Sequence, residues 1–216
     1  MKMLFENVDY IVNKVKILDK INISITTEKF TSIVGANGSG KTTLLNLLTS
    51  NINPSNGEII APNHEEFSYI PQAIQDPPFL QVFEIVLAGM NLLEIDKKYK
   101  YKLVEKYLSQ CGIKKLYSKY FYDLSEGEKQ RVWLAFCLSQ SRDIIIMDEP
   151  LSSIDQESKL EFYKLLKEIQ SLQKTIILVT HDINSAIMFS DEIIEIDDGK
   201  IIFSGPLSGY TLRSKI

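Results

Sequence analysis

Apolar residues follow two different patterns along this chain. From Leu4 to about Ile25, apolar and polar residues alternate, most clearly at Ile21–Ile25, which predicts strands with one buried face. Ile144–Met147 is instead a continuous apolar run, and Thr175–Val179 is apolar after its first residue, as expected of parallel strands covered on both faces. The two patterns together predict an antiparallel N-terminal part joined to a mainly parallel sheet.

Several further strand candidates are short. They are Phe30–Val34, Glu58–Ile60, Phe67–Ile70, Glu192–Ile196 and Lys200–Ser204. The last two flank Asp198-Gly199, a residue pair typical of a tight hairpin turn.

Helical periodicity replaces these patterns in the middle of the chain. Val82–Met90 and Lys98–Gln110 are predicted as helices, and Gly112 would end the second one. One side of that second helix collects apolar residues, namely Leu103, Val104, Tyr107 and Leu108. No convincing strand follows until Asp143.

These elements predict one α/β domain over residues 1–216 with a helical insertion. The core would comprise residues of about 1–78 and 141–216, and a helical subdomain would comprise about 79–140. A length of 216 residues suits one such domain with a sizeable core.

Composition narrows the class of protein further. The chain is 44% hydrophobic and 24% charged, with a net charge of −4 and a pI near 5.3, which argues against a broad nucleic-acid surface. The longest apolar runs are far shorter than the ~20 residues of a membrane span, and Met1–Glu6 has no apolar signal core. Cys111 and Cys137 lack metal-ligand spacing and are expected to be structural.

The glycine-rich stretch Gly35–Thr43 carries the clearest chemistry. It fits the pattern G-x-x-x-x-G-K-[ST] and lies between the strand candidate Phe30–Val34 and a predicted helix over Thr43–Leu48. The residues predicted to bind nucleotide here are Gly35, Asn37, Gly38, Ser39, Gly40, Lys41, Thr42 and Thr43. Backbone amides would cradle the phosphates, Lys41 would pair with the β/γ-phosphates, and Thr42 would ligate Mg²⁺.

Polar side chains follow both buried apolar runs. Asp148 and Glu149 come after Ile144–Met147, where we expect Asp148 to hold Mg²⁺ and Glu149 to orient an attacking water. His181 ends the second run, a position that favours a γ-phosphate contact. His64 lies in a polar loop and is expected to be solvated.

Two further residues, Ser125 and Tyr10, have interpretations that are at least partly structural. Ser125, followed three residues later by Glu128, predicts a capping box with Ser125 as the helix N-cap. Tyr10 is predicted to lie in the loop between two N-terminal strands. There it would stack on an adenine ring or, with similar weight, pack against a sheet edge.

This set of motifs, in this order, resembles the nucleotide-binding subunits of ATP-binding cassette (ABC) transporters. Gly35–Thr43 is similar to the Walker A loop, Leu124–Glu128 to the signature Leu-Ser-Gly-Gly-Gln, and Ile144–Asp148 to Walker B. Gln72 corresponds to the glutamine that joins Mg²⁺ and water to the helical subdomain, and Glu149 corresponds to the catalytic glutamate. Ser152–Asp155 is similar to the D-loop, and His181 to the switch histidine. Tyr10 is the best match for the adenine-stacking aromatic residue.

The resemblance implies an ATPase that binds ATP and Mg²⁺ and works as a homodimer or paired cassette. Each ATP would lie between one Walker A loop and the partner's signature, contacted by Ser125 and Gly127, with Asp155 of the D-loop nearby. A separate transmembrane permease subunit would place a coupling helix in a groove near Gln72 and residues 73–90. The chain would then be cytoplasmic and peripheral on the inner face of the cell membrane, with no nucleic-acid partner.

The signature departs from the family pattern at two positions. Glu126 replaces a glycine and Glu128 replaces the glutamine, and we expect Glu126 to turn from the ATP towards Lys129. The Gly-Glu-Lys at 127–129 keeps an alternative open, a soluble cassette such as the ATPase of iron–sulfur cluster assembly. Pro71-Gln72 followed by Phe79–Gly89 favours an importer subunit, and Val82–Gly89 faintly resembles metal or metal-chelate importers.

Overall fold

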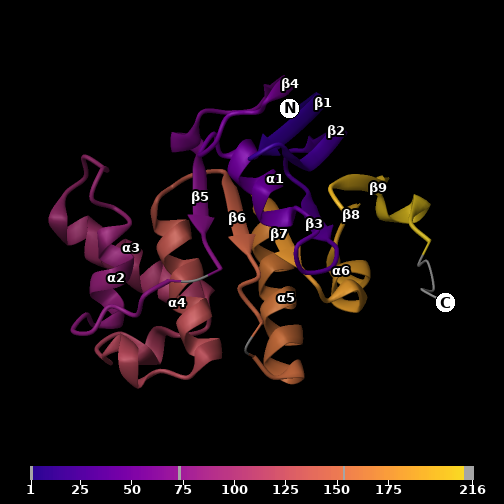
Figure 1. The fold of residues 1–216 in the computed structure, drawn as a ribbon. Helices are drawn as coiled ribbons and strands as arrows, with labels where there is room; N and C mark the ends of the chain where they lie inside the picture. The colour runs from indigo at the N-terminus through magenta and orange to yellow at the C-terminus, as the bar shows by residue number, and fades with distance from the viewer. Residues whose placement is uncertain (1, 73, 153, 212–216) are drawn as a thin grey trace.

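A six-stranded sheet forms the centre of the molecule (Figure 1). The computed structural model describes residues 2–72, 74–152 and 154–211, so Ser153 of the predicted D-loop and Ala73 of the predicted groove lie outside the described residues. In order across the sheet, the strands are β5 (Phe67–Ile70), β6 (Ile144–Asp148), β7 (Thr175–Thr180), β3 (Phe30–Val34), β8 (Glu192–Asp197) and β9 (Lys200–Pro206). The first five are parallel and β9 is antiparallel to β8, which confirms the predicted mainly parallel sheet.

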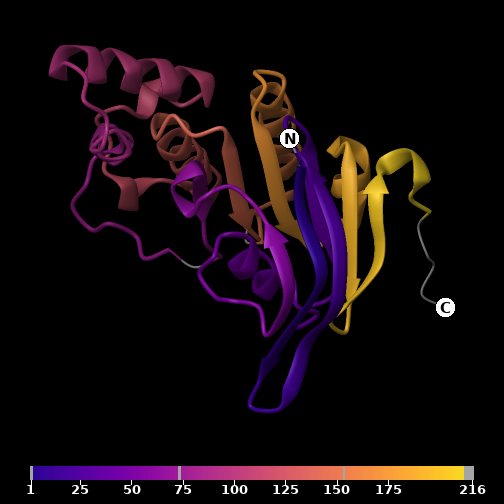
Figure 2. The same cartoon turned by 90° about the horizontal axis from the view of Figure 1, so that it is seen from above.

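A second sheet is antiparallel and has the order β2-β1-β4, with β1 at Lys2–Val12, β2 at Val15–Thr26 and β4 at Asn56–Ile60. Strands β1 and β2 form a long hairpin that projects beyond the rest of the molecule when it is seen from above (Figure 2). Its turn is Asn13-Lys14, both with positive φ (48° and 66°), as a two-residue hairpin turn requires.

This hairpin corrects the predicted position of Tyr10. Tyr10 belongs to β1, where it pairs with Leu18 of β2, rather than to a loop between strands. The reason is that the chain reverses three residues later, at Asn13, because asparagine adopts positive φ more readily than most residues.

Alternate residues of the central strands enter two separate cores. Ile145 and Met147 of β6 face one core, whereas Ile144 and Ile146 face the other. Helix α5 (Gln156–Gln170) packs on the face of the sheet that carries Ile145 and Met147. Helix α1 (Lys41–Leu48) and the antiparallel sheet pack on the opposite face, which carries Ile144 and Ile146. Strands buried on both faces explain why their sequences are apolar without alternation.

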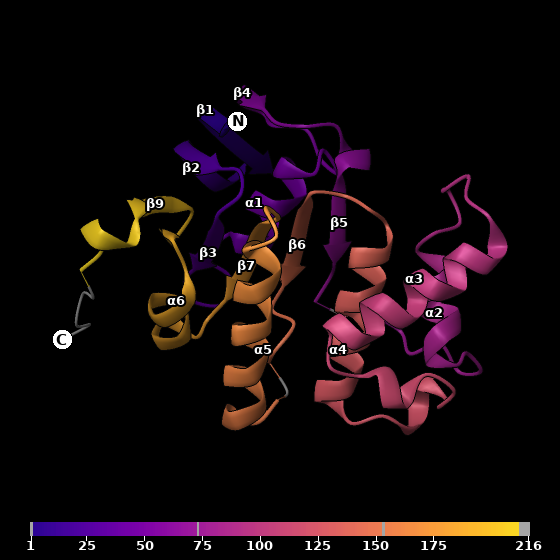
Figure 3. The ribbon, with the colours of Figure 1, turned by 180° about the vertical axis from the view of Figure 1, so that it is seen from behind.

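Three helices gather beside the β5 edge, on the side opposite β9 (Figures 1 and 3). They are α2 (Val82–Ala88), α3 (Lys97–Gln110) and α4 (Glu126–Ser139), and they confirm the predicted helical stretch. In the chain segment that leads from β5 to β6, the described residues form one isolated β-bridge, from Gln81 to Tyr120. The last helix, α6 (Ile183–Phe189), packs below β3 and β8.

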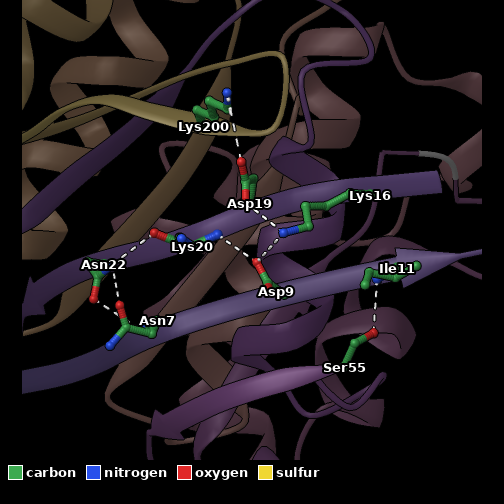
Figure 4. A network of polar contacts seen from close by, with 9 residues as sticks. All are labelled: Asn7, Asp9, Ile11, Lys16, Asp19, Lys20, Asn22, Ser55 and Lys200. Atoms are coloured by element: carbon green, nitrogen blue, oxygen red, sulfur yellow. Dashed lines mark hydrogen bonds and ion pairs between the residues drawn. The ribbon is translucent and has the colours of Figure 1, made fainter. Parts of the chain in front are cut away.

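A polar network stabilises the outer face of the hairpin (Figure 4). Asp9 Oδ1 accepts hydrogen bonds from the Lys20 backbone N–H at 2.8 Å and from Lys16 Nζ at 3.2 Å. Lys16 also binds Asp19 at 2.8 Å, and the Asn7 N–H donates to Asn22. These contacts lie at register shifts between β1 and β2, so they fix the irregular pairing of the two strands.

The cysteines agree with their predicted structural role, since both are buried and free. Burial raises the pKa of the Cys111 thiol to about 12 and also raises the pKa of the Cys137 thiol, so neither forms a thiolate readily. In the part of the chain that is described, none of the helices has the length and apolar character needed to cross a bilayer.

Candidate functional site

The glycine-rich loop connects β3 to the N-terminus of α1. Gly40 is the N-cap residue and has a φ of 109°, a conformation that favours glycine. A Cβ at this position would also come within 2.7 Å of Leu18 Cδ2. Within the described structure no side chain caps this helix end, so its first amides are available to an anion.

Lys41 folds its side chain back over this loop. Its Nζ donates to the backbone carbonyls of Gly35 at 3.0 Å and Ala36 at 2.9 Å, and it lies 3.3 Å from Glu149 Oε1. The side chain is only 4% exposed, so the ammonium group is held at the floor of the site.

Glu149 is the centre of the predicted catalytic group. Its Oε2 lies 3.5 Å from Gln72 Nε2 and 3.6 Å from His181 Nδ1, while its Oε1 faces Lys41. Its backbone has a φ of 47°, which is uncommon outside glycine and marks a strained position at the end of β6. The structure therefore brings together, around one carboxylate, the three residues predicted to be catalytic.

Asp148 and Thr42 form a candidate metal site beside it. The Thr42 hydroxyl donates to Asp148 Oδ2 at 2.9 Å, and burial raises the pKa of the Asp148 carboxyl. The other oxygen, Oδ1, is buried without a hydrogen-bond partner among the described residues. An orphaned carboxylate oxygen next to a hydroxyl suits Mg²⁺, which takes oxygen ligands and completes its shell with phosphates and water.

A cavity of about 290 Å³ lies over the loop and is lined by four segments of the chain. It is lined by Asn37, Gly38, Gly40, Lys41, Thr42 and Thr43 of the loop and helix, and by Ile17, Gln72 and Glu149. Six of the eight loop residues predicted to bind nucleotide therefore line one cavity.

Ile17 is the lining residue that the sequence did not reveal. Tyr10 pairs with Leu18 while Ile11 pairs with Lys16, so Ile17 is the extra residue of a β-bulge, which turns its side chain relative to its neighbours. Tyr10 is half-buried against the core under the antiparallel sheet and, of the described residues, is not one that lines the cavity. A bulge leaves little trace in an alternating pattern, so only a three-dimensional structure identifies Ile17.

Ser125 and Gly127 lie at the start of α4, away from the lining of this cavity. The capping box is confirmed, because the Glu128 N–H donates to Ser125 Oγ at 3.3 Å and the Ser125 N–H donates to Glu128 Oε2 at 3.0 Å. Gly127 faces α5, because a Cβ added at Gly127 would lie 3.8 Å from the Cβ of Ser158. In a single chain the signature and the glycine loop thus form separate sites.

Two acidic residues near the signature also have defined contacts. Glu126 Oε1 lies 2.9 Å from Lys129 Nζ, which confirms the expected direction of its side chain. Asp155 is the N-cap of α5 and accepts from the Ser158 N–H at 3.0 Å, a contact that lowers the pKa of its carboxyl.

A larger cavity of about 420 Å³ separates the central sheet from the helical group. Residues on both sides line it, including Asn51, His64, Phe67, Tyr69, Gly89, Leu92, Phe136 and Arg142. Ala88 and Gly89 come from the predicted groove range of 73–90, but Gln72 faces the nucleotide cavity instead. His64 is exposed, as expected, and lines this cavity as well.

Comparisons of sequence and of structure with known proteins find relatives of the same kind. Residues 18–152 match the family model described as ABC transporter. The petrobactin import ATP-binding protein YclP of Bacillus subtilis is 33% identical over 208 residues, covering 88% of this chain and 81% of its own length. The structure of cbiO1 from Clostridium perfringens, part of the ABC transporter complex cbiONQ, superimposes with a TM-score of 0.87 at 28% identity, covering 95% of this chain and 88% of that one.

A third relative was solved as a dimer. The ATP-binding cassette MJ0796, in a post-hydrolysis state with ADP and Pi, has a TM-score of 0.82 at 26% identity and covers 96% of this chain and all of that one (100%). Its fold matches both the central sheet and the helical group described above.

Proposed function

The chain belongs to the ABC transporter family, and on that premise we propose that it powers import through a separate membrane subunit, with Glu149 orienting the attacking water. It is an ATP-binding subunit and an ATPase of that family. The observation that carries the proposed mechanism is the position of Glu149, whose carboxylate contacts Lys41, Gln72 and His181 together.

The contacts suggest how nucleotide binding would prepare this carboxylate. Lys41 is paired with Glu149 in the present structure, and a γ-phosphate would compete for the same ammonium group. Glu149 would then be free to accept a hydrogen bond from water, with Gln72 and His181 positioned on its other oxygen. Thr42 and Asp148 would hold Mg²⁺, which neutralises developing phosphate charge when it is bound.

Glu149→Gln tests the assignment directly. The variant keeps a similar shape but cannot act as a base, so ATP binding should persist while turnover falls by roughly 100-fold or more. Nucleotide titration and phosphate release measure the two properties separately. Glu168→Gln, on the exposed face of α5, serves as the matched control and should hydrolyse ATP normally. Undiminished turnover in Glu149→Gln would remove Glu149 from the mechanism.

We further propose a head-to-tail dimer in which Ser125 and Gly127 complete the partner's nucleotide site. Both lie at a helix N-terminus, a favourable position for a phosphate, yet the cavity over Lys41 is lined without them. A relative solved as a dimer supports this arrangement. Glu149→Gln should therefore sediment as a dimer with ATP and as a monomer without nucleotide.

The membrane partner would be a permease that inserts a coupling helix into the cavity of about 420 Å³. That position would hold the chain at the cytoplasmic face of the membrane, and residues of about 79–140 would move as a subdomain against the core. The name of YclP, an import ATP-binding protein, and that of cbiO1, part of a transporter complex, favour this function over a soluble cassette of iron–sulfur cluster assembly.

A further inference from the structure

Lys129 contacts two segments that are far apart in the sequence. Its Nζ lies 2.6 Å from Asp76 Oδ2 and 2.9 Å from Glu126 Oε1. The same ammonium group lies 5.8 Å from the centre of the Phe121 ring. Asp76 belongs to the connection between β5 and α2, four residues after Gln72, while Glu126 begins α4 directly after Ser125.

We propose that Lys129 is a positioning residue that fastens the first turn of α4 to the segment following Gln72, so that Ser125 and Gln72 move as one unit. The inference rests on the proposed function, because it assigns Gln72 to the chain's own nucleotide and Ser125 to the partner's. Binding of nucleotide in one site would thereby be communicated to the surface that completes the other.

The burial of the Lys129 side chain distinguishes its ion pairs from those between fully exposed side chains. The Lys129 side chain is 13% exposed, although its partners Asp76 and Glu126 are 46% and 54% exposed. Hydrogen bonding to Asp76, and then to Glu126, raises the pKa of the Lys129 ammonium. One ammonium group, itself largely shielded from solvent, therefore contacts carboxylates on both segments at once.

The surrounding geometry explains why a charged link is needed here. The two segments face each other across a polar cavity of about 150 Å³, which Gln72, Asp76, Glu126, Lys129 and Trp133 line together. Apolar packing therefore does not fill the space between them, and Lys129 reaches across it instead. Glu126, the departure from the family's glycine, adds the second carboxylate and directs Lys129 from its own helix.

Trp133 makes the link measurable in the nucleotide-free monomer. It is the only tryptophan of the chain, it is half-buried, and it lines the same cavity. Lys129→Gln and Asp76→Asn should each increase quenching of Trp133 by acrylamide, and the double variant should show no more quenching than either single variant. Lys129→Arg, which keeps the charge, should behave as the wild type. Unchanged quenching in both single variants, or fully additive increases, would overturn the proposal.

Dimer closure gives the second readout. In the Glu149→Gln background, Lys129→Gln should raise the ATP concentration needed for half-maximal dimerisation roughly threefold or more, the scale of one partly screened ion pair. Binding of ATP to the monomer should stay unchanged, which a general loss of folding would not allow. Equal dimerisation with and without Lys129 would contradict the link.

The two proposals fail in distinguishable ways. A parent Glu149→Gln protein that stays monomeric with ATP would reject the dimer of the proposed function. The quenching measurement would then decide alone whether Lys129 joins the two segments.

Discussion

Ile17 and Tyr10 illustrate how neighbouring residues of one hairpin can face different surroundings. Ile17 is the bulged residue of β2 and lines the cavity over the glycine loop. Tyr10 pairs with Leu18 and packs against the core beneath. The base-stacking role expected of Tyr10 stays a prediction, and we propose Ile17, which lines the cavity, as an apolar contact for the base.

Alanine substitution separates these two residues. Ile17→Ala should weaken ATP binding roughly fivefold, because it removes an apolar side chain from the cavity wall. Tyr10→Ala should lower the free energy of unfolding instead, since it removes part of the packing under the sheet. Titration with a fluorescent ATP analogue and urea denaturation provide the measurements. A loss of affinity confined to Tyr10→Ala would restore Tyr10 as the base contact.

At the scale of an element, the β1–β2 hairpin depends on Asp9 for its register. The hydrogen bond from the Lys20 N–H, followed by the contact with Lys16, holds the pKa of the Asp9 carboxyl below its ordinary value of 3.8. A lowered pKa in the folded state means that Asp9 stabilises the protein above about pH 4. This stabilisation is lost as the pH falls through the lowered pKa.

Asp9→Asn tests this contribution through its pH dependence. The variant should be less stable than the wild type at pH 7. The difference should shrink as the pH falls from about 4 through the lowered pKa of Asp9, below which Asp9 is protonated in both states. Denaturation by urea across this range measures it. Glu58→Gln, exposed on the neighbouring strand β4, is the control and should follow the wild type at every pH. A difference that does not change with pH would exclude the charge of Asp9 as the cause.

At the scale of the whole molecule, the helical group and the central sheet meet around the cavity of about 420 Å³. Leu92 lines that cavity and is 86% exposed, so a large apolar side chain is presented to solvent at the proposed docking site. An apolar side chain exposed at the wall of a cavity makes this surface a candidate for binding another protein.

Leu92→Asp should disrupt assembly with the membrane subunit while the isolated chain still folds and binds ATP. A buried charge without a partner is costly at an interface, so co-purification with the permease should fall at least tenfold, an order-of-magnitude expectation. Leu172→Asp changes another exposed leucine, after the end of α5, and should assemble normally. Normal assembly of Leu92→Asp would place the docking surface elsewhere.

The structure explains why prediction from the sequence succeeded for some features. The buried strands β6 and β7, the capping box at Ser125 and the glycine loop depend on residues close together in the chain, so local pattern and spacing suffice. The Glu126–Lys129 contact was also predictable, since residues three apart on a helix are neighbours.

By itself, therefore, the sequence determined the element types, the phosphate-binding loop and the identity of the acidic and histidine side chains beside it. Only the tertiary structure decided that Glu149 meets Lys41, Gln72 and His181, that Ile17 lines the cavity, and that Lys129 reaches Asp76. These contacts join segments tens of residues apart, or depend on a bulge that changes strand register. Their positions follow from how the sheet and helices pack, which local residue patterns do not encode.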